Sequence, residues 1–153
     1  CIGQTQAIAA YCGKLSGFYP SDPFEAAKVD EAIDGMTDAT DLITDTMQER
    51  DPNRKIQWRQ YLIGPQGRLT MFISGLERIL ADSGKGFFAG SSCSVADLAA
   101  WRFVGWLTGG VIDGIPHDYV ANMFPRLWKL HLDVGSLPGV IEWQANHPGN
   151  YRH

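Results

Sequence analysis

The chain has 153 residues, of which 44% are hydrophobic and 20% are charged, a balance that fits one globular domain with a sizeable core. Its formal net charge at pH 7 is −4, which argues against nucleic acid as a main partner, because phosphate binding needs a basic face. The longest apolar candidate, residues 95–107, is interrupted by Asp97 and Arg102, so the sequence predicts no membrane span.

The three cysteines, Cys1, Cys12 and Cys93, form neither a CxxC pair nor a metal-binding spacing. An odd number of cysteines without such spacing is typical of reduced thiols inside the cell. We therefore expect a cytoplasmic protein, or an organellar one if a targeting segment precedes Cys1. The histidines are scattered without zinc spacing, and no metal is expected.

Helical periodicity recurs along the first half of the chain, and strand patterns are nearly absent. A first helix is predicted from Thr5, as its N-cap, to the glycines at 13 and 17, with Ala7, Ile8 and Tyr11 turned inward. Residues 17–23 (GFYPSDP) indicate a linker. A long helix then runs over about 24–49, and residues 51–55 (DPNRK) break or bend it. Its predicted buried stripe is Val29, Ile33, Met36, Ile43 and Met47.

The second half begins with another long helix over about 67–82. Ser94 and Asp97 then form a predicted capping box, in which each side chain bonds the backbone amide of the other residue. We expect this pair to stabilise a buried helix over 95–108 rather than to do chemistry. Three short helices are expected near 118–123, 125–134 and 138–146. The pattern predicts an all-helical bundle of about six or seven helices.

Four segments carry a more specific signal: GQTQAI (3–8), YPSDPFEAAKVDEAIDGMTD (19–38), GFFAGSSCSVADL (86–98) and FPRLWKLHLDVGSLPGVIEW (124–143). In this order they resemble the glutathione transferase family, nearest to its sigma, pi and mu classes. The resemblance implies that residues 1–16 are the last loop and helix of a thioredoxin-like N-terminal domain. It further implies a linker over 17–23 and the family's helical C-terminal domain over 24–153.

The family adds the thiolate of glutathione to a small electrophile. Its Tyr or Ser thiolate donor and its cis-proline belong to the thioredoxin-like domain, before the position that Cys1 occupies. The resemblance thus assigns no catalytic residue to this chain, which by itself is expected to have little or no activity. It also implies glutathione as co-substrate and a homodimer as the assembly. The competing hypothesis is a non-catalytic docking module within a larger assembly.

Gln4 and Thr5 match the family's Gln-Ser pair and are candidates for binding the γ-glutamyl end of glutathione. A helix N-terminus attracts a carboxylate through its unpaired amides and partial positive charge. The alternative is that Thr5 only caps its helix and that Gln4 is a solvated loop residue.

Five aspartates, Asp30, Asp34, Asp38, Asp41 and Asp45, lie at helical spacing along the long helix. Most of them indicate a solvated face. Asp38 matches the family's aspartate that reaches across the dimer to the amino group of glutathione.

The resemblance also places the electrophile pocket along the C-terminal half of the long helix, at Met47 and Gln48, although Met47 fits the core equally well. An apolar face at Tyr11, Trp101 and Trp106 is expected to be partly uncovered, where the thioredoxin-like domain would pack.

Overall fold

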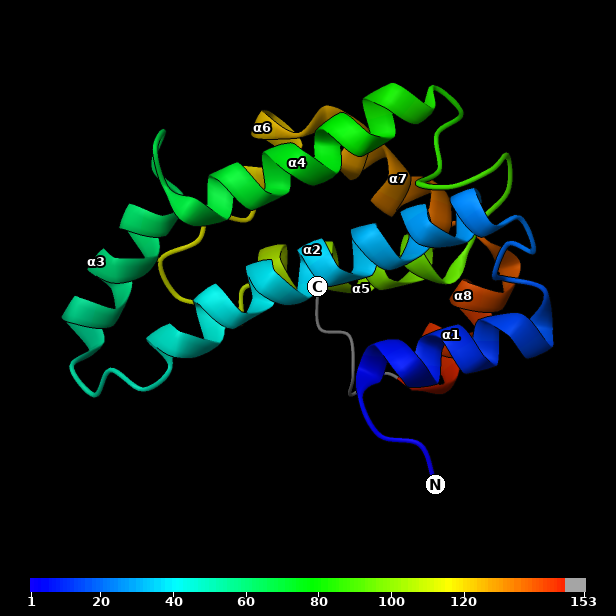
Figure 1. Cartoon of the computed structure of the whole chain (residues 1–153). Coiled ribbons are helices and arrows are strands. Elements are labelled where there is room, and N and C mark those ends of the chain that lie inside the picture. The colour runs from blue at the N-terminus through cyan, green and yellow to red at the C-terminus, as the bar shows by residue number, and fades with distance from the viewer. Residues whose placement is uncertain (148–153) are drawn as a thin grey trace.

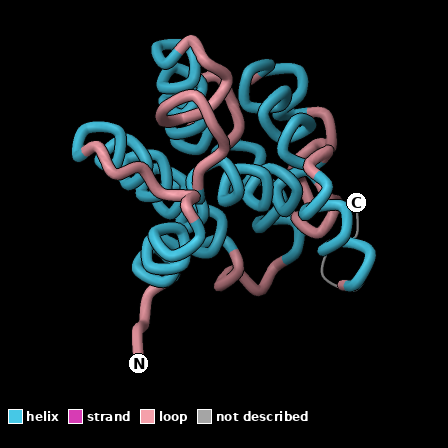
Figure 2. The backbone as a smooth tube through the Cα atoms, turned by 90° about the vertical axis from the view of Figure 1, so that its right-hand side faces the viewer, coloured by secondary structure: helices cyan, strands magenta, loops and turns pink. Residues whose placement is uncertain are grey.

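Residues 1–147 are described by the computed structural model, which builds them from eight α-helices (Figure 1). The helices are α1 Thr5–Ser16, α2 Pro23–Thr46, α3 Pro52–Leu62, α4 Arg68–Ser83, α5 Val95–Thr108, α6 Tyr119–Met123, α7 Pro125–Gly135 and α8 Pro138–Asn146. Within these residues there is no strand, and Figure 2 shows helices joined by loops. The all-helical prediction is confirmed. None of the helices in this part of the chain combines the length and apolar character needed to cross a bilayer.

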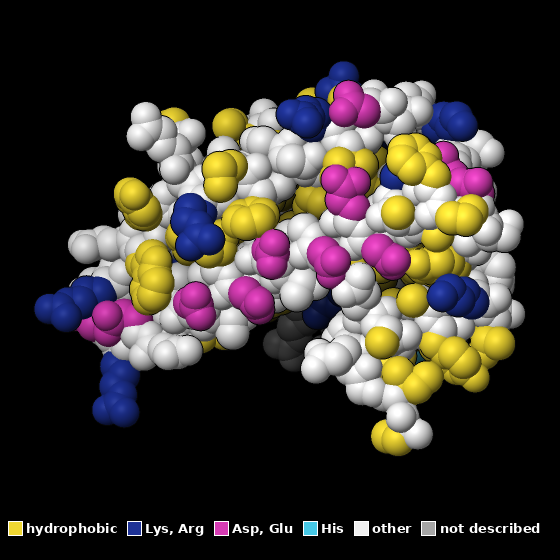
Figure 3. Space-filling view, in the orientation of Figure 1, with side chains coloured by type: hydrophobic (Ala, Val, Ile, Leu, Met, Phe, Trp, Pro, Cys, Tyr) yellow, Lys and Arg dark blue, Asp and Glu magenta, His cyan; other side chains and the backbone are white. Residues whose placement is uncertain are grey.

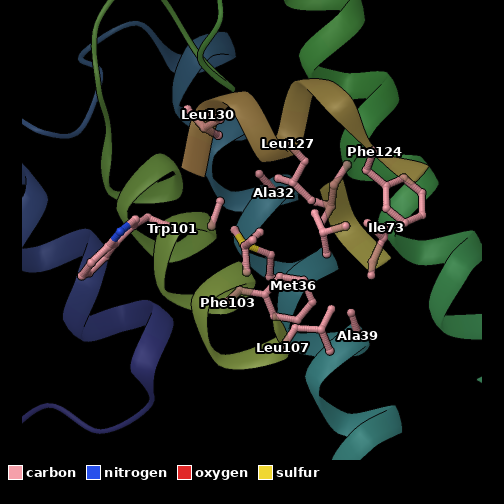
Figure 4. Packing of buried hydrophobic residues seen from close by; sticks show 14 of the residues in the cluster. Ala32, Met36, Ala39, Ile73, Trp101, Phe103, Leu107, Phe124, Leu127 and Leu130 are labelled. Carbon is pink, nitrogen blue, oxygen red and sulfur yellow. The ribbon is translucent and has the colours of Figure 1, made fainter. Parts of the chain in front are cut away.

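The core forms around α5, which packs against α2 and α7, while α2 also packs against α4. Apolar side chains from these helices meet in one cluster, because each helix carries its apolar stripe on the face toward the others. Figure 4 shows part of this cluster: Ala32, Met36, Ala39, Ile73, Trp101, Phe103, Leu107, Phe124, Leu127 and Leu130.

The stripe predicted on α2 is buried at Val29, Ile33, Met36 and Ile43, but Met47 is 49% exposed. The prediction of Met47 in the core is wrong because the helix ends at Thr46. The Thr46 hydroxyl donates to the carbonyl of Ile43 at 2.6 Å.

The helix α3 is absent from the sequence prediction, which treated residues 51–55 as a break. The helix α2 ends at Thr46, six residues before Pro52, and Pro52 begins the next helix, since the missing N–H of a proline costs nothing at a first helical position. The Asp51 side chain caps the amides of Asn53 and Arg54 at 2.9 and 3.3 Å. The buried Arg59 then ties α3 to the end of α2, with its Nε 2.8 Å from the Thr46 hydroxyl.

The orientation of α1 also differs from the prediction. Its buried residue is Gly13, where an added Cβ would stand 2.7 Å from Cγ1 of Val95. Ala7, Ile8 and Tyr11 are exposed instead of inward, because the closest approach to α5 occurs on the face with the small residues. Of the three aromatic residues expected to be uncovered, Tyr11 is 52% exposed and Trp106 is half-buried, whereas the expectation was wrong for the buried Trp101.

Ser94 and Asp97 form the reciprocal capping arrangement at the start of α5. The Asp97 Oδ2 accepts hydrogen bonds from the Ser94 amide and hydroxyl, both at 2.7 Å, and its Oδ1 accepts one from the Phe88 amide at 3.0 Å. Burial raises the pKa of the Asp97 carboxyl above its ordinary value, since the hydrogen bonds offset only part of the desolvation. The pair thereby joins the loop before α5 to the helix itself.

Candidate functional site

A cavity of about 680 Å³ lies where the start of α1 meets α2 and α5, and we call it the α1–α2–α5 cavity. Residues 4–6 form one side of it. A second side is the middle of α2, and the third is α5 from Ala99 to Trp106. Segments far apart in the sequence are thus brought into one lining of a size typical of small-molecule sites.

The start of α1 gives this cavity its polar end. Gln4 is the N-cap residue, with a φ of 70°, and is the one non-glycine residue with positive φ among those that the structure describes. Such a conformation costs on the order of 1–3 kcal/mol and is often retained at functional sites. Thr5 is therefore not the N-cap, contrary to the prediction, and within residues 1–147 no side chain caps α1. The Thr5 hydroxyl, which is exposed at the cavity, is left available to a ligand.

The sides formed by α2 and α5 are mixed in character. Met36 and Phe103 are buried and apolar, and Trp106 is half-buried. From α2, the polar residues Thr37, Thr40 and Asp41 also line the cavity. The arrangement suits an amphipathic ligand with an apolar body.

The aspartates of α2 form a row along its exposed side, and Figure 3 shows acidic side chains in line along this helix. Asp30 is the exception: it accepts a hydrogen bond from the Tyr19 hydroxyl at 2.8 Å, and burial together with this bond raises the pKa of Tyr19 to about 12. Asp38 is exposed and stands outside the lining that the described residues give the α1–α2–α5 cavity, whereas Asp41 is part of it. Asp38 is thus open to contact from outside the chain.

Met47 and Gln48 are not brought together with Gln4 and Thr5 in the described part of the chain. Gln48 lines a separate polar hollow with Glu49 and Trp58 near the junction of α2 and α3. The part of α2 that does line the α1–α2–α5 cavity lies about two to four turns earlier. The periodicity could not locate it, because every turn of a long amphipathic helix offers an equivalent face.

The comparison with known families decides the assignment. A family model described as "Glutathione S-transferase, C-terminal domain" matches residues 41–147. The chain belongs to this family. The resemblance predicted from the four sequence segments is confirmed, and so is the family's C-terminal-type helical bundle.

Solved structures of the transferase fold agree with this assignment. Prostaglandin synthase D of Nilaparvata lugens is 22% identical, with a TM-score of 0.82 over 96% of this chain and 69% of that one. The monomeric glutathione S-transferase Na-GST-3 of Necator americanus is also 22% identical, with a TM-score of 0.75 over the same shares of 96% and 69%. A glutathione transferase of Streptococcus pneumoniae, complexed with glutathione, is 21% identical, with a TM-score of 0.66 over 92% of this chain and 54% of that one. These likenesses support the fold.

A second, apolar cavity of about 720 Å³ lies where the end of α1 meets α5 and α8 of the transferase fold, lined by Phe18, Trp101 and Trp143 among others. Cys93 also lines it, and burial together with nearby Asp97 raises the pKa of this thiol to about 12. Because the raised pKa favours the protonated thiol at neutral pH, Cys93 is expected to be a poor nucleophile. In the described residues no group of three or more His, Cys, Asp or Glu side chains is arranged to hold a metal ion.

Proposed function

We propose that this chain supplies the helical part of a glutathione-conjugating transferase and that its α1–α2–α5 cavity holds the electrophile beside glutathione. The observation that carries the proposal is the joining of two kinds of surface in one cavity. A helix start that no side chain of residues 1–147 caps meets an apolar and aromatic wall from α2 and α5. Conjugation needs this neighbourhood, because the thiolate sulfur and the electrophilic carbon must come close enough to form a bond.

In this proposal Gln4 and Thr5 bind the γ-glutamyl end of glutathione. The first-turn amides of α1 have no partner within the helix, and a carboxylate is favoured there by their N–H groups and by the helix dipole. The Thr5 hydroxyl adds a further donor, and the Gln4 amide offers both donor and acceptor.

The assembly that we propose is a two-fold homodimer inside the cell, in which Asp38 of each chain meets the amino group of the glutathione bound by its partner. Its exposed position on α2 supports this role. We assign residues 1–16 to a thioredoxin-like domain, residues 17–23 to the linker, and residues 24–153 to the helical domain.

The thiolate itself needs a hydroxyl donor, and in this proposal that donor lies outside residues 1–147, because the Thr5 hydroxyl at the cavity is assigned to the γ-glutamyl end. Tyr19 commits its hydroxyl hydrogen to Asp30, and the Tyr119 hydroxyl is bonded to Thr70 at 2.8 Å. The chain's contribution is to bind and orient both reactants and to keep water from the reacting atoms.

The test is isothermal titration of glutathione into the protein and into Thr5→Ala. A hydrogen bond to a charged group contributes about 1.5–3 kcal/mol, so the variant should bind glutathione about tenfold or more weakly. Ser16→Ala is the matched control, since Ser16 is an exposed hydroxyl at the opposite end of the same helix. If the protein takes up no glutathione, or if Thr5→Ala binds it as tightly as Ser16→Ala does, the proposal is wrong.

The alternative, a docking module without catalysis, has an observation of its own. Ile8, Tyr11 and Leu15 leave an apolar strip exposed along α1, with Leu15 at 72%. Exposed apolar strips of this kind mark interfaces. Absence of glutathione binding in the titration would favour this function.

A further inference from the structure

We propose that the α1–α2–α5 cavity selects aromatic electrophiles that carry an N–H or O–H donor over those that carry only acceptors or a carboxylate. The inference rests on the proposed function, because it takes this cavity as the electrophile site. The feature that carries it is a set of hydrogen-bond acceptors on α2, formed by Thr37, Thr40 and Asp41, which we call the acceptor turn.

The two hydroxyls of the acceptor turn have already used their hydrogens. Thr37 donates to the carbonyl of Ile33 at 2.9 Å, and Thr40 donates to the carbonyl of Met36 at 2.8 Å. A hydroxyl has one hydrogen and two lone pairs, so each of these oxygens can offer a ligand only an acceptor.

Asp41 completes the set with a carboxylate, which also accepts. It lies one turn after Thr37 and directly after Thr40, and side chains four residues apart on a helix share a face. The three acceptors consequently stand within about one helical turn of each other on the side of α2 that lines the cavity.

The opposite side of the cavity suits an aromatic ring. Phe103 and Trp106 of α5 have ring centroids 6.5 Å apart at 46°, and Met36 of α2 lines the same cavity. The donors on this side, the guanidinium of Arg102 and the indole N–H of Trp106, belong to α5 and not to the acceptor turn. Arg102 already takes part in an interaction of its own within the chain.

A ring packed against α5 therefore turns its polar substituent toward acceptors. An O–H or N–H group satisfies one of them as the ligand displaces water. An ether oxygen has no hydrogen to donate, so its lone pairs face the lone pairs of the acceptor turn. A carboxylate is in addition repelled by the negative charge of Asp41. The amides of Gln4 and Gln6, which carry donors as well as acceptors, stand at the start of α1, on the proposed glutathione side.

The experiment compares three probes with the same ring system: β-naphthol, its methyl ether and β-naphthoate. Each is titrated into the protein without glutathione, and amide NMR shifts at Thr37, Thr40 and Trp106 report both affinity and location. One hydrogen bond between neutral groups is expected to make naphthol bind about three- to tenfold more tightly than the ether. Naphthoate should bind most weakly.

The double variant Thr37→Val with Thr40→Val tests whether the hydroxyl oxygens cause the preference, because it keeps the shape of both side chains and removes both oxygens. In it, the preference for naphthol over the ether should shrink to about twofold or less, because one of the three acceptors, Asp41, remains. Thr44→Val is the matched control: its hydroxyl donates to the Thr40 carbonyl at 3.1 Å in the same manner but lies outside the acceptor turn. This variant should keep the full preference.

Equal affinities for naphthol and ether overturn the inference, as does an equal loss of preference in Thr44→Val. Shifts confined to Trp101 and Trp143 would place the probes in the other cavity and overturn it as well. The outcome is distinct from that of the glutathione titration. A donor preference without glutathione binding would leave the selectivity standing and refute the proposed function, whereas glutathione binding without the preference would do the reverse.

Discussion

Replacing Asp97 by Ala should be among the most damaging single changes in the helical bundle. The Asp97 carboxylate is fully buried and accepts three hydrogen bonds, from the Ser94 amide, the Ser94 hydroxyl and the Phe88 amide. Each buried donor left without a partner costs about 1–3 kcal/mol. The Ser94 hydroxyl can turn to another acceptor and a water can enter the space, so we expect a loss of about 3–5 kcal/mol in the free energy of unfolding.

The assay is urea denaturation followed by tryptophan fluorescence and by circular dichroism. A loss of this size is a large part of the 5–15 kcal/mol typical of a domain, so the midpoint should fall steeply or the variant should be unfolded in water. Ser94→Ala is the milder variant, which removes one donor and the cap and should cost about 1 kcal/mol.

The control is Asp34→Ala on the exposed side of α2, which should change stability by less than about 0.5 kcal/mol. A loss below about 1 kcal/mol for Asp97→Ala, or one equal to that of Asp34→Ala, would refute the reasoning that these three donors depend on this carboxylate.

Two further predictions concern a thiol and a pair of glycines. With its pKa raised to about 12, Cys93 should react with iodoacetamide at pH 8 at least a hundredfold more slowly than exposed Cys1 and Cys12, as followed by mass spectrometry, and equal rates would contradict the burial of its thiol. Gly13→Ala should destabilise the fold by about 1 kcal/mol, because the clash 2.7 Å from Val95 outweighs the gain in helix propensity. Gly75→Ala, where no described atom lies within 4 Å of the added Cβ, should instead stabilise the fold by about 0.5–1 kcal/mol in the same urea assay. If both variants changed the free energy of unfolding in the same direction, the result would be inconsistent with the packing of α1.

The sequence alone determined the helical class and most helix positions, because these depend on neighbours within a few residues. The apolar spacing of α2 and α4 and the prolines that begin α7 and α8 act locally. The family, too, could be predicted from short segments in a fixed order. Apolar periodicity did not predict α3, because most of its residues are polar. Its N-cap and first residue, Asp51 and Pro52, are as typical of the end of a helix as of its start.

The tertiary structure alone decided which face of each helix meets which neighbour. On α1 the apolar Ile8 and Tyr11 suggested the inner face, yet the small Gly13 permits the closest approach to α5. The same holds for the candidate site. Thr5 was predicted from its match to the family's Gln-Ser pair, whereas Thr40 and Phe103 became part of the same cavity only through the packing of α1, α2 and α5. Apolar periodicity shows only which residues share a face of one helix. Which face meets a neighbouring helix depends on how closely the two helix axes can approach, and that distance is set jointly by residues far apart in the chain.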